Sequence, residues 1–312
     1  VISSLLKEIR DIDRKAVLLS TAAAADREEI WRVLSAFVRG NDLKLALTAL
    51  SAVDGFAGSD KKDKLALYSE TVRRKEPELI ALAALLAYKA GNAKSIKLLR
   101  QLLESDSEKH RFEAVKALSE IPAETAVPII ISNFDDETDE NIIDQMFYAL
   151  RKLLPKLKRV EIIENTMLPW LSRKLKSSDS FIRNQVAVLG GYLGVLAEEP
   201  LISALSKETH PYVIASLLSA LGRCGCNKLL LFTEFPPSID KTEITNALSK
   251  IATVKTESNS EDYYKDGVLS GNVSSGSSGY GSGYSNESDY DSNFQVNTSS
   301  GYLGNGGSET TF

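Results

Sequence analysis

The sequence predicts an all-α protein in which helical hairpins stack into an α-solenoid, followed by a tail without a core. Three observations lead to this prediction. Apolar residues recur at helical spacing through residues 1–255, short clusters of Gly, Pro, Asn and Asp interrupt them, and one small-then-aliphatic step returns at a nearly constant interval. Patterns typical of β-strands are nearly absent from this region.

The hairpin unit is clearest between Glu76 and Asp106. The segment EPELIALAALLAYKAGNAKSIKLLRQLLESD contains an apolar-rich helix, a turn at Gly91-Asn92 and a second, amphipathic helix. Because a short turn joins two helices of similar length, we expect the segment to fold as an antiparallel helical hairpin.

The small-then-aliphatic step sets the register of about seven such hairpins. Successive steps are 33, 35, 33, 32, 39 and 32 residues apart. A period this steady is typical of a solenoid, in which one hairpin cannot bury its apolar face alone and packs against its neighbours. The steps lie at Ala16-Val17, Ala49-Leu50, Ala84-Leu85, Ala117-Leu118, Ala149-Leu150, Val188-Leu189 and Ala220-Leu221.

Prolines and glycines fit the same register. Pro128 and Pro200 are expected near the starts of second helices, where a missing N–H costs little. Gly190 and Gly222 directly follow the leucine of two adjacent repeats. We expect these glycines to permit close contact between helices or to end the helix, which is a structural role.

These features resemble the HEAT and HEAT-like repeats, especially the short variety also found in phycobilin lyase subunits. That pattern combines an Asp, an Arg, a small-Leu-Gly step and a second helix with a Pro-Leu pair. The residues that carry it are Asp179, Arg183, Leu189 and Gly190 with the segment AEEPLISAL, then Leu221 and Gly222 in a repeat that lacks the Arg. The resemblance implies a right-handed superhelix whose second helices line a concave face.

The composition changes near Lys255 and divides the chain into two predicted domains, a solenoid over residues 1–255 and a low-complexity tail over residues 256–312. The tail has eight acidic residues and one Lys, so the overall charge of −5 conceals a slightly positive solenoid. Because the tail is rich in Ser and Gly and poor in aliphatic residues, we expect it to be disordered.

Candidate catalytic and metal-binding residues do not converge in the sequence. His110 and His210 lie in different repeats, and Cys224 and Cys226 have no second Cys or His cluster to complete a tetrahedral site. We therefore expect a protein without catalytic activity, cofactor or metal. His210 is expected at the start of a helix, and the two thiols are expected to be buried or in a turn.

Other partners and locations are constrained by charge and hydropathy. The apolar runs are too short to span a bilayer. The two cysteines lie only two residues apart, too close to join distant segments, and no secretion signal is visible, so we expect a cytoplasmic protein. The near-neutral solenoid argues against nucleic acid as a partner, because basic residues do not alternate with aromatic ones along several repeats. A protein or peptide is the expected partner.

A basic cluster is the candidate binding site. The segment RKLLPKLKR carries five positive charges and interrupts the period with about six extra residues, and insertions in solenoids commonly form functional loops. Its cations either complement a helix dipole or bind an acidic or phosphate-bearing partner. The candidate residues are Arg151, Lys152, Lys156, Lys158, Arg159, Trp170, Arg173 and Lys174.

The functional hypothesis is a non-catalytic scaffold that binds protein on the concave face of the solenoid. The tail could moderate this binding, because Glu287, Asp289 and Asp291 lie among tyrosines and could compete for the basic cluster. Two enzyme alternatives follow from the resemblance alone. They are a phycobilin-lyase-like subunit and a HEAT-like DNA glycosylase.

Overall fold

The computed structural model describes residues 28–226, together with residues 15, 17, 242, 244–247 and 249. Every regular element within these residues is a helix, which confirms the predicted all-α class. The predicted boundary at Lys255 and the tail of residues 256–312 lie outside the described part of the chain.

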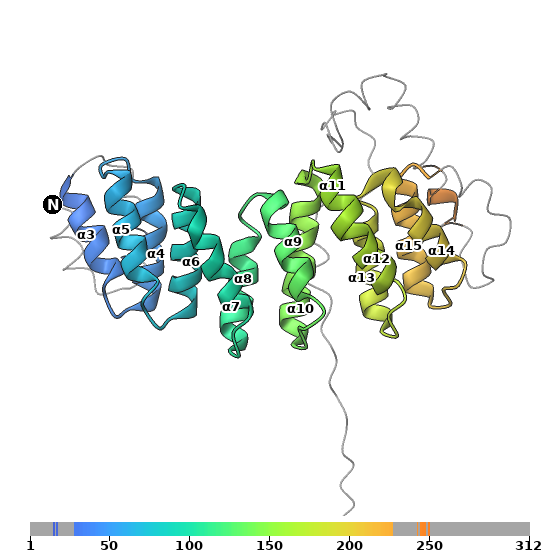
Figure 1. The fold of residues 1–312 in the computed structure, drawn as a ribbon, viewed down its shortest axis with the longest axis horizontal. Coiled ribbons are helices and arrows are strands. Elements are labelled where there is room, and N and C mark those ends of the chain that lie inside the picture. The colour runs from blue at the N-terminus through green and yellow to red at the C-terminus, as the bar shows by residue number, and fades with distance from the viewer. Residues whose placement is uncertain are drawn as a thin grey trace, which may run out of the picture. The chain divides into compact units, whose positions relative to one another are not determined.

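The helices alternate between first and second members of hairpins, which lie side by side in chain order (Figure 1). The first helices are α4 (Leu43–Gly55), α6 (Pro77–Lys89), α8 (Glu108–Leu118), α10 (Glu140–Leu153), α13 (Ser180–Gly190) and α15 (Pro211–Arg223). The second helices are α3 (Glu28–Val38), α5 (Lys61–Thr71), α7 (Ile96–Leu103), α9 (Ala123–Asn133), α12 (Leu168–Lys174) and α14 (Glu198–Leu205).

Short helical turns extend three of the second helices at their N-terminal ends. They are η1 (Ala93–Ser95) before α7, α11 (Val160–Ile162) with the π-helical turn η3 (Ile163–Met167) before α12, and η4 (Gly194–Ala197) before α14. The described residues thus contain the second to sixth hairpins of the predicted register, with α3 before them and α15 after them.

Side chains at the N-caps explain where several first helices begin. Asp42 Oδ1 accepts a hydrogen bond of 2.9 Å from the N–H of Leu45, and Asp139 Oδ1 accepts one of 3.0 Å from Ile142. Each bond satisfies an amide that has no partner within its helix. Asp139 belongs to the acidic run of residues 135–140, so this run supplies the cap of α10.

The hairpins share one core because their helices contact neighbours on both sides. Each described first helix contacts the next first helix, and second helices such as α3, α5 and α7 contact the first helix of the following hairpin. The leucines of the repeated step are buried, and Leu50, Leu118, Leu150, Leu189 and Leu221 are fully so. Burial of the same position in the second to seventh repeats confirms the predicted register there. Val17, in the first predicted step, is instead 63% exposed.

Two details of the predicted register were wrong. Pro128 lies inside α9 rather than near its start, because the turn before this helix is short and the helix already begins at Ala123. The segment 151–159 is not a free insertion loop. Arg151 and Lys152 belong to the last turn of α10, and the extra length is taken up by a 3-10 turn, η2 (Leu154–Lys156), and by the lengthened second helix.

Candidate protein-interaction surfaces

The basic turn, residues 154–159 between α10 and α11, is held in place by its leucines. Leu154 and Leu157 are fully buried, whereas Lys156, Lys158 and Arg159 are exposed. The backbone N–H of Lys158 also donates a hydrogen bond of 3.3 Å to Glu124 of α9. The turn therefore presents three cations from an anchored backbone.

Arg151 and Lys152, the predicted cations that precede the basic turn, make contacts within the protein. Lys152 pairs with Glu120 at the end of α8, and Arg151 donates a hydrogen bond of 2.6 Å to Gln185 of α13. Arg159, by contrast, has only a distant ion pair with Glu161, at 3.9 Å. The structure thus divides the predicted basic cluster into cations that join helices and cations that face solvent.

The prediction that Trp170 contributes to a binding surface was wrong. Its side chain is 1% exposed and packs edge-on against Phe134, with ring centroids 5.1 Å apart. The reason is the register of α12, which points Trp170 toward α9 and the core. The neighbouring Arg173 and Lys174 both pair with Asp135, and Lys174 lies over the Phe134 ring, so these cations stabilise the α9–α12 contact.

The repeat-pattern residues lie where a structural role requires them. Asp179 caps α13 by accepting a hydrogen bond of 2.8 Å from the N–H of Phe181. Gly190 is buried, and a Cβ atom there would approach Leu201 Cδ2 to 2.8 Å and Leu171 Cδ1 to 3.3 Å. A side chain at this position would overlap the adjoining second helices. Gly222 is likewise buried, in α15.

Arg183 joins two consecutive turns between hairpins. Its guanidinium donates hydrogen bonds to the carbonyls of Ser177 and Ser178, at 2.9 and 3.0 Å, and to both carboxylate oxygens of Glu208, at 2.7 and 3.0 Å. The Glu208 carboxylate also accepts hydrogen bonds from the N–H groups of Thr209 and His210. One arginine therefore ties the turn before α13 to the turn before α15.

The same contact recurs two repeats earlier and was not predicted. Arg111 donates to the carbonyls of Ser105 and Asp106 and to both oxygens of Glu137, which in turn accepts from the backbone N–H groups of the next two residues. A related contact joins Arg74 to Glu76 and to the carbonyls of Val38 and Gly40 at the end of α3. We call these three contacts the arginine clasps. Their sequence signal is an Arg followed by a Glu 25 or 26 residues later, in Arg183–Glu208 and Arg111–Glu137.

The clasps change the acidity of their carboxyl groups. Burial disfavours the charged form of Glu208, but hydrogen bonds from Arg183 and from the N–H groups of His210 and Thr209 outweigh it and lower its pKa. Burial also acts to raise the pKa of Glu137, but its hydrogen bonds from Arg111 and from two backbone N–H groups outweigh burial, so the pKa is lowered. Arg74 lowers the pKa of Glu76 to about 2.

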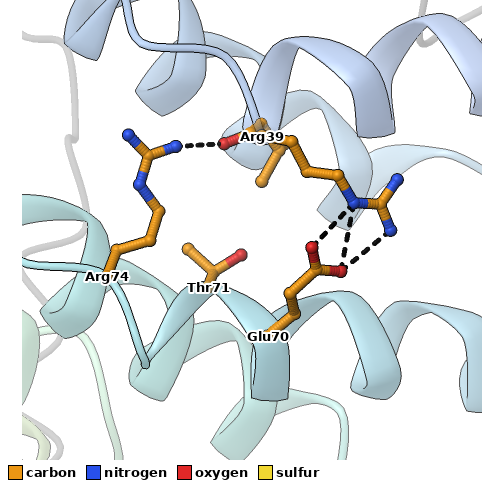
Figure 2. Close-up of a pocket in the computed structure, with 5 residues that line it drawn as sticks. Arg39, Glu70, Thr71 and Arg74 are labelled. Carbon is orange, nitrogen blue, oxygen red and sulfur yellow. Dashed lines mark hydrogen bonds and ion pairs between the residues drawn. The ribbon is translucent and has the colours of Figure 1, made fainter.

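A small pocket of about 160 Å³ lies where the ends of α3 and α5 meet (Figure 2). Arg39 and Glu70 point toward each other across it, with hydrogen bonds of 2.8 to 3.1 Å, while Arg74 reaches the Val38 carbonyl at 2.7 Å. Because the charged groups of the pocket satisfy one another, its arrangement fits a contact between repeats rather than a ligand site.

The histidines and cysteines show no shared site within the described residues. His210 is the N-cap residue of α15, as expected, although its side chain makes no capping hydrogen bond. Cys224 and Cys226 are buried, also as expected, and burial raises the pKa of the Cys224 thiol to about 12. No group of His, Cys, Asp or Glu in the described part of the chain could hold a metal ion.

Comparison with known proteins supports the repeat architecture. Residues 66–151, from within α5 to the last turn of α10, match the family model for HEAT repeats. These residues are HEAT repeats. No curated protein matches the chain.

Two solved structures are similar to the HEAT-repeat array. The X-ray structure of YibA from Escherichia coli has a TM-score of 0.51 at 13% identity, with 80% of this chain and 92% of that chain covered. A designed armadillo repeat protein has a TM-score of 0.34 at 16% identity, with 72% and 98% covered. The likeness to YibA shows the fold alone. In the described residues no helix is long and apolar enough to cross a membrane.

Proposed function

We propose that this protein is a non-catalytic scaffold whose HEAT repeats bind another protein, and that the basic turn contacts an acidic segment of that partner. The observation that carries the proposal is the anchored display of Lys156, Lys158 and Arg159. Buried leucines hold the backbone of the turn, so little conformational freedom is lost when these cations engage a partner.

Electrostatics supports an acidic partner at this turn. Lys152 pairs with Glu120, and Arg151 is held against Gln185 of α13, so the charge of the turn itself comes from the three solvent-facing cations. Cations in a cluster attract a polyanionic segment over about a Debye length, roughly 8 to 10 Å at physiological salt. The contact is therefore expected to weaken as salt rises.

The test is binding of a labelled poly-glutamate peptide to the full chain. Reversing Lys156, Lys158 and Arg159 to Glu should weaken binding at least about fivefold at low salt and remove most of its salt dependence. The matched control reverses Lys62, Lys97 and Arg100, which are exposed cations of α5 and α7, and gives the same change in net charge. If both variants lose the same affinity for poly-glutamate, the effect comes from the net charge of the protein, and the proposal is contradicted.

The tail remains part of the proposal on sequence grounds. If its acidic residues compete for the basic turn, neutralising Glu287, Asp289 and Asp291 to their amides should strengthen poly-glutamate binding. Unchanged affinity would remove the tail from this role. The described residues offer no specific observation in favour of the lyase or glycosylase alternatives, so one function is proposed.

A further inference from the structure

Exposed aromatic side chains occur on the first helices of the fifth to seventh hairpins. Tyr148 of α10 is 47% exposed, Phe181 of α13 is 41% exposed and Tyr212 of α15 is 77% exposed. Among the described residues, Val17 and Val195 are the other large hydrophobic side chains with comparable exposure. Large apolar side chains gathered on a surface are typical of an interaction site, so their relative positions matter.

The repeat register places these aromatic residues on the same side of their helices, because Tyr148 lies seven residues, about two helical turns, beyond the position of α10 that Phe181 occupies in α13. We call the surface that carries Tyr148, Phe181 and Tyr212 the aromatic face. α10 contacts α13, and α13 contacts α15. Phe181 and Tyr212 each lie two residues after the N-cap of their helix, so they occupy the same position in consecutive repeats. The Phe181 ring meets the ring of Phe147 edge-on at 6.2 Å, which joins it to the helix that carries Tyr148.

Polar contacts between the same helices make the face continuous. Asn184 of α13 accepts a hydrogen bond of 2.7 Å from Ser216 of α15. Arg151 binds Gln185, and Arg223 donates to the Val188 carbonyl at 3.2 Å while lying over the Tyr192 ring. Both arginines lie at the C-terminal ends of their helices, away from Phe181 and Tyr212 at the N-terminal ends of α13 and α15.

The carboxylates of the face are differently placed. Glu140 and Asp144 lie four residues apart on α10, with Tyr148 another four residues on, so the three side chains share one side of the helix. No ion pair joins either carboxylate to a cation of the described residues. Burial raises the pKa of Asp144, which nearby Glu140 raises further and Arg151 partly offsets. Glu140 and Asp144 are thus exposed carboxylates without a direct cationic contact among the described residues.

We propose that this aromatic face binds a segment of a partner protein in which Lys or Arg side chains alternate with apolar ones. Exposed aromatic rings attract both apolar side chains and cations, and the carboxylates of Glu140 and Asp144 add charge of the complementary sign. The inference goes beyond the proposed function, because it concerns first helices rather than the basic turn and takes a segment of opposite charge.

An acidic segment or a nucleic acid fits this face poorly. Either would bring negative charge toward Glu140 and Asp144, and like charges brought together at an interface repel. A purely apolar segment would cover the exposed carboxylates of Glu140 and Asp144 without giving them a cation. The combination of aromatic surface and unpaired carboxylates therefore selects a segment that is both cationic and apolar.

The experiment selects a library of short random peptides against the full chain and measures the affinity of the enriched peptides. Selected sequences should combine Lys or Arg with apolar residues. Tyr212→Ser and the double variant F181S/Y212S should each weaken a selected peptide at least about fivefold, since large aromatic side chains dominate such contacts. Asp144→Asn should weaken it and reduce its salt dependence.

Matched controls separate the face from general effects. Val195→Ser removes an equally exposed hydrophobic side chain outside the face, and Glu104→Gln neutralises an exposed carboxylate on the α7 side of the stack. Neither should change the affinity of the peptide. Because Tyr212 is mostly solvent-exposed, its variant should also keep the wild-type melting temperature.

Three outcomes would overturn the proposal. They are an absence of enrichment, enrichment of acidic or uncharged peptides, and equal binding of the selected peptide to wild type and Tyr212→Ser. These outcomes are distinct from failure of the proposed function, which is read from poly-glutamate binding to the basic turn.

Discussion

The first helices of hairpins two to four and those of hairpins five to seven occupy equivalent positions in the stack, yet they present different chemistry to solvent. Two residues after the N-cap, α4, α6 and α8 carry Lys44, Glu78 and Lys109, and the last two pair at 2.6 Å. The same position in α13 and α15 carries Phe181 and Tyr212.

This difference shows which positions the solenoid constrains. The buried leucine of the repeated step is retained in both regions, because neighbouring hairpins share one core and each needs it. Exposed positions contribute little to stability, so they are free to differ. At this position Glu78 and Lys109 of the third and fourth hairpins pair with each other, whereas Phe181 and Tyr212 of the sixth and seventh hairpins leave aromatic surface available.

The largest expected effect tests the shared core. Leu189→Ala should reduce the free energy of unfolding by roughly 2 to 5 kcal/mol, because the fully buried side chain would leave a cavity. Leu118→Ala in the fourth hairpin should cost a similar amount if both regions depend on the same core. Denaturant unfolding measures both changes. A loss below about 0.5 kcal/mol for either variant would mean that its region does not depend on this position.

The second prediction concerns the clasps. Arg183→Ala should cost about 2 to 3 kcal/mol, because it leaves the nearly buried Glu208 carboxylate without its charged partner. Arg111→Ala should match it, since Glu137 is buried to a similar degree. Arg39→Ala is the control and should cost about 0 to 1 kcal/mol, because Arg39 and Glu70 are each about half exposed. Equal losses in all three variants would contradict a special role for the clasps.

The third prediction compares two helix-terminal glycines. Gly190→Ala should destabilise the protein by roughly 1 to 3 kcal/mol, because the added Cβ would overlap Leu201. Gly55→Ala should be neutral or stabilise by up to about 1 kcal/mol, since nothing lies within 4 Å of its Cβ position and alanine favours the helix. Thermal melting of the two variants checks the pair, and a stabilised Gly190→Ala would show that the helices can separate there.

The smallest expected effect is the pH dependence of stability. The pKa values of Glu76 and Glu208 are lowered on folding, so their ionised forms stabilise the folded state above about pH 4.5, and this stabilisation is lost as pH falls toward 2. Glu76→Gln and Glu208→Gln should each reduce the loss of unfolding free energy between pH 5 and pH 2 by about 1 kcal/mol. If the melting temperatures of both variants change with pH between pH 2 and pH 5 as those of wild type do, these carboxylates do not contribute to the acid dependence of stability.

The sequence by itself determined the helical hairpins, their register and the caps. Apolar spacing specifies which side of each helix is buried, and residues such as Asp139 act on amides only three positions away, so both signals are local. The leucines at positions 118, 150 and 189 could be assigned to the core for the same reason.

Only the tertiary structure decided which side chains meet across hairpins. Trp170 proved to be a core residue and Arg151 a link to α13, because the distances between hairpins depend on how the helices stack rather than on their periods. Arg183 and Glu208 are separated by a whole helix in sequence but lie 2.7 Å apart. The tertiary structure also decided the aromatic face, because the exposure of Phe181 and Tyr212 depends on which neighbouring side chains cover them.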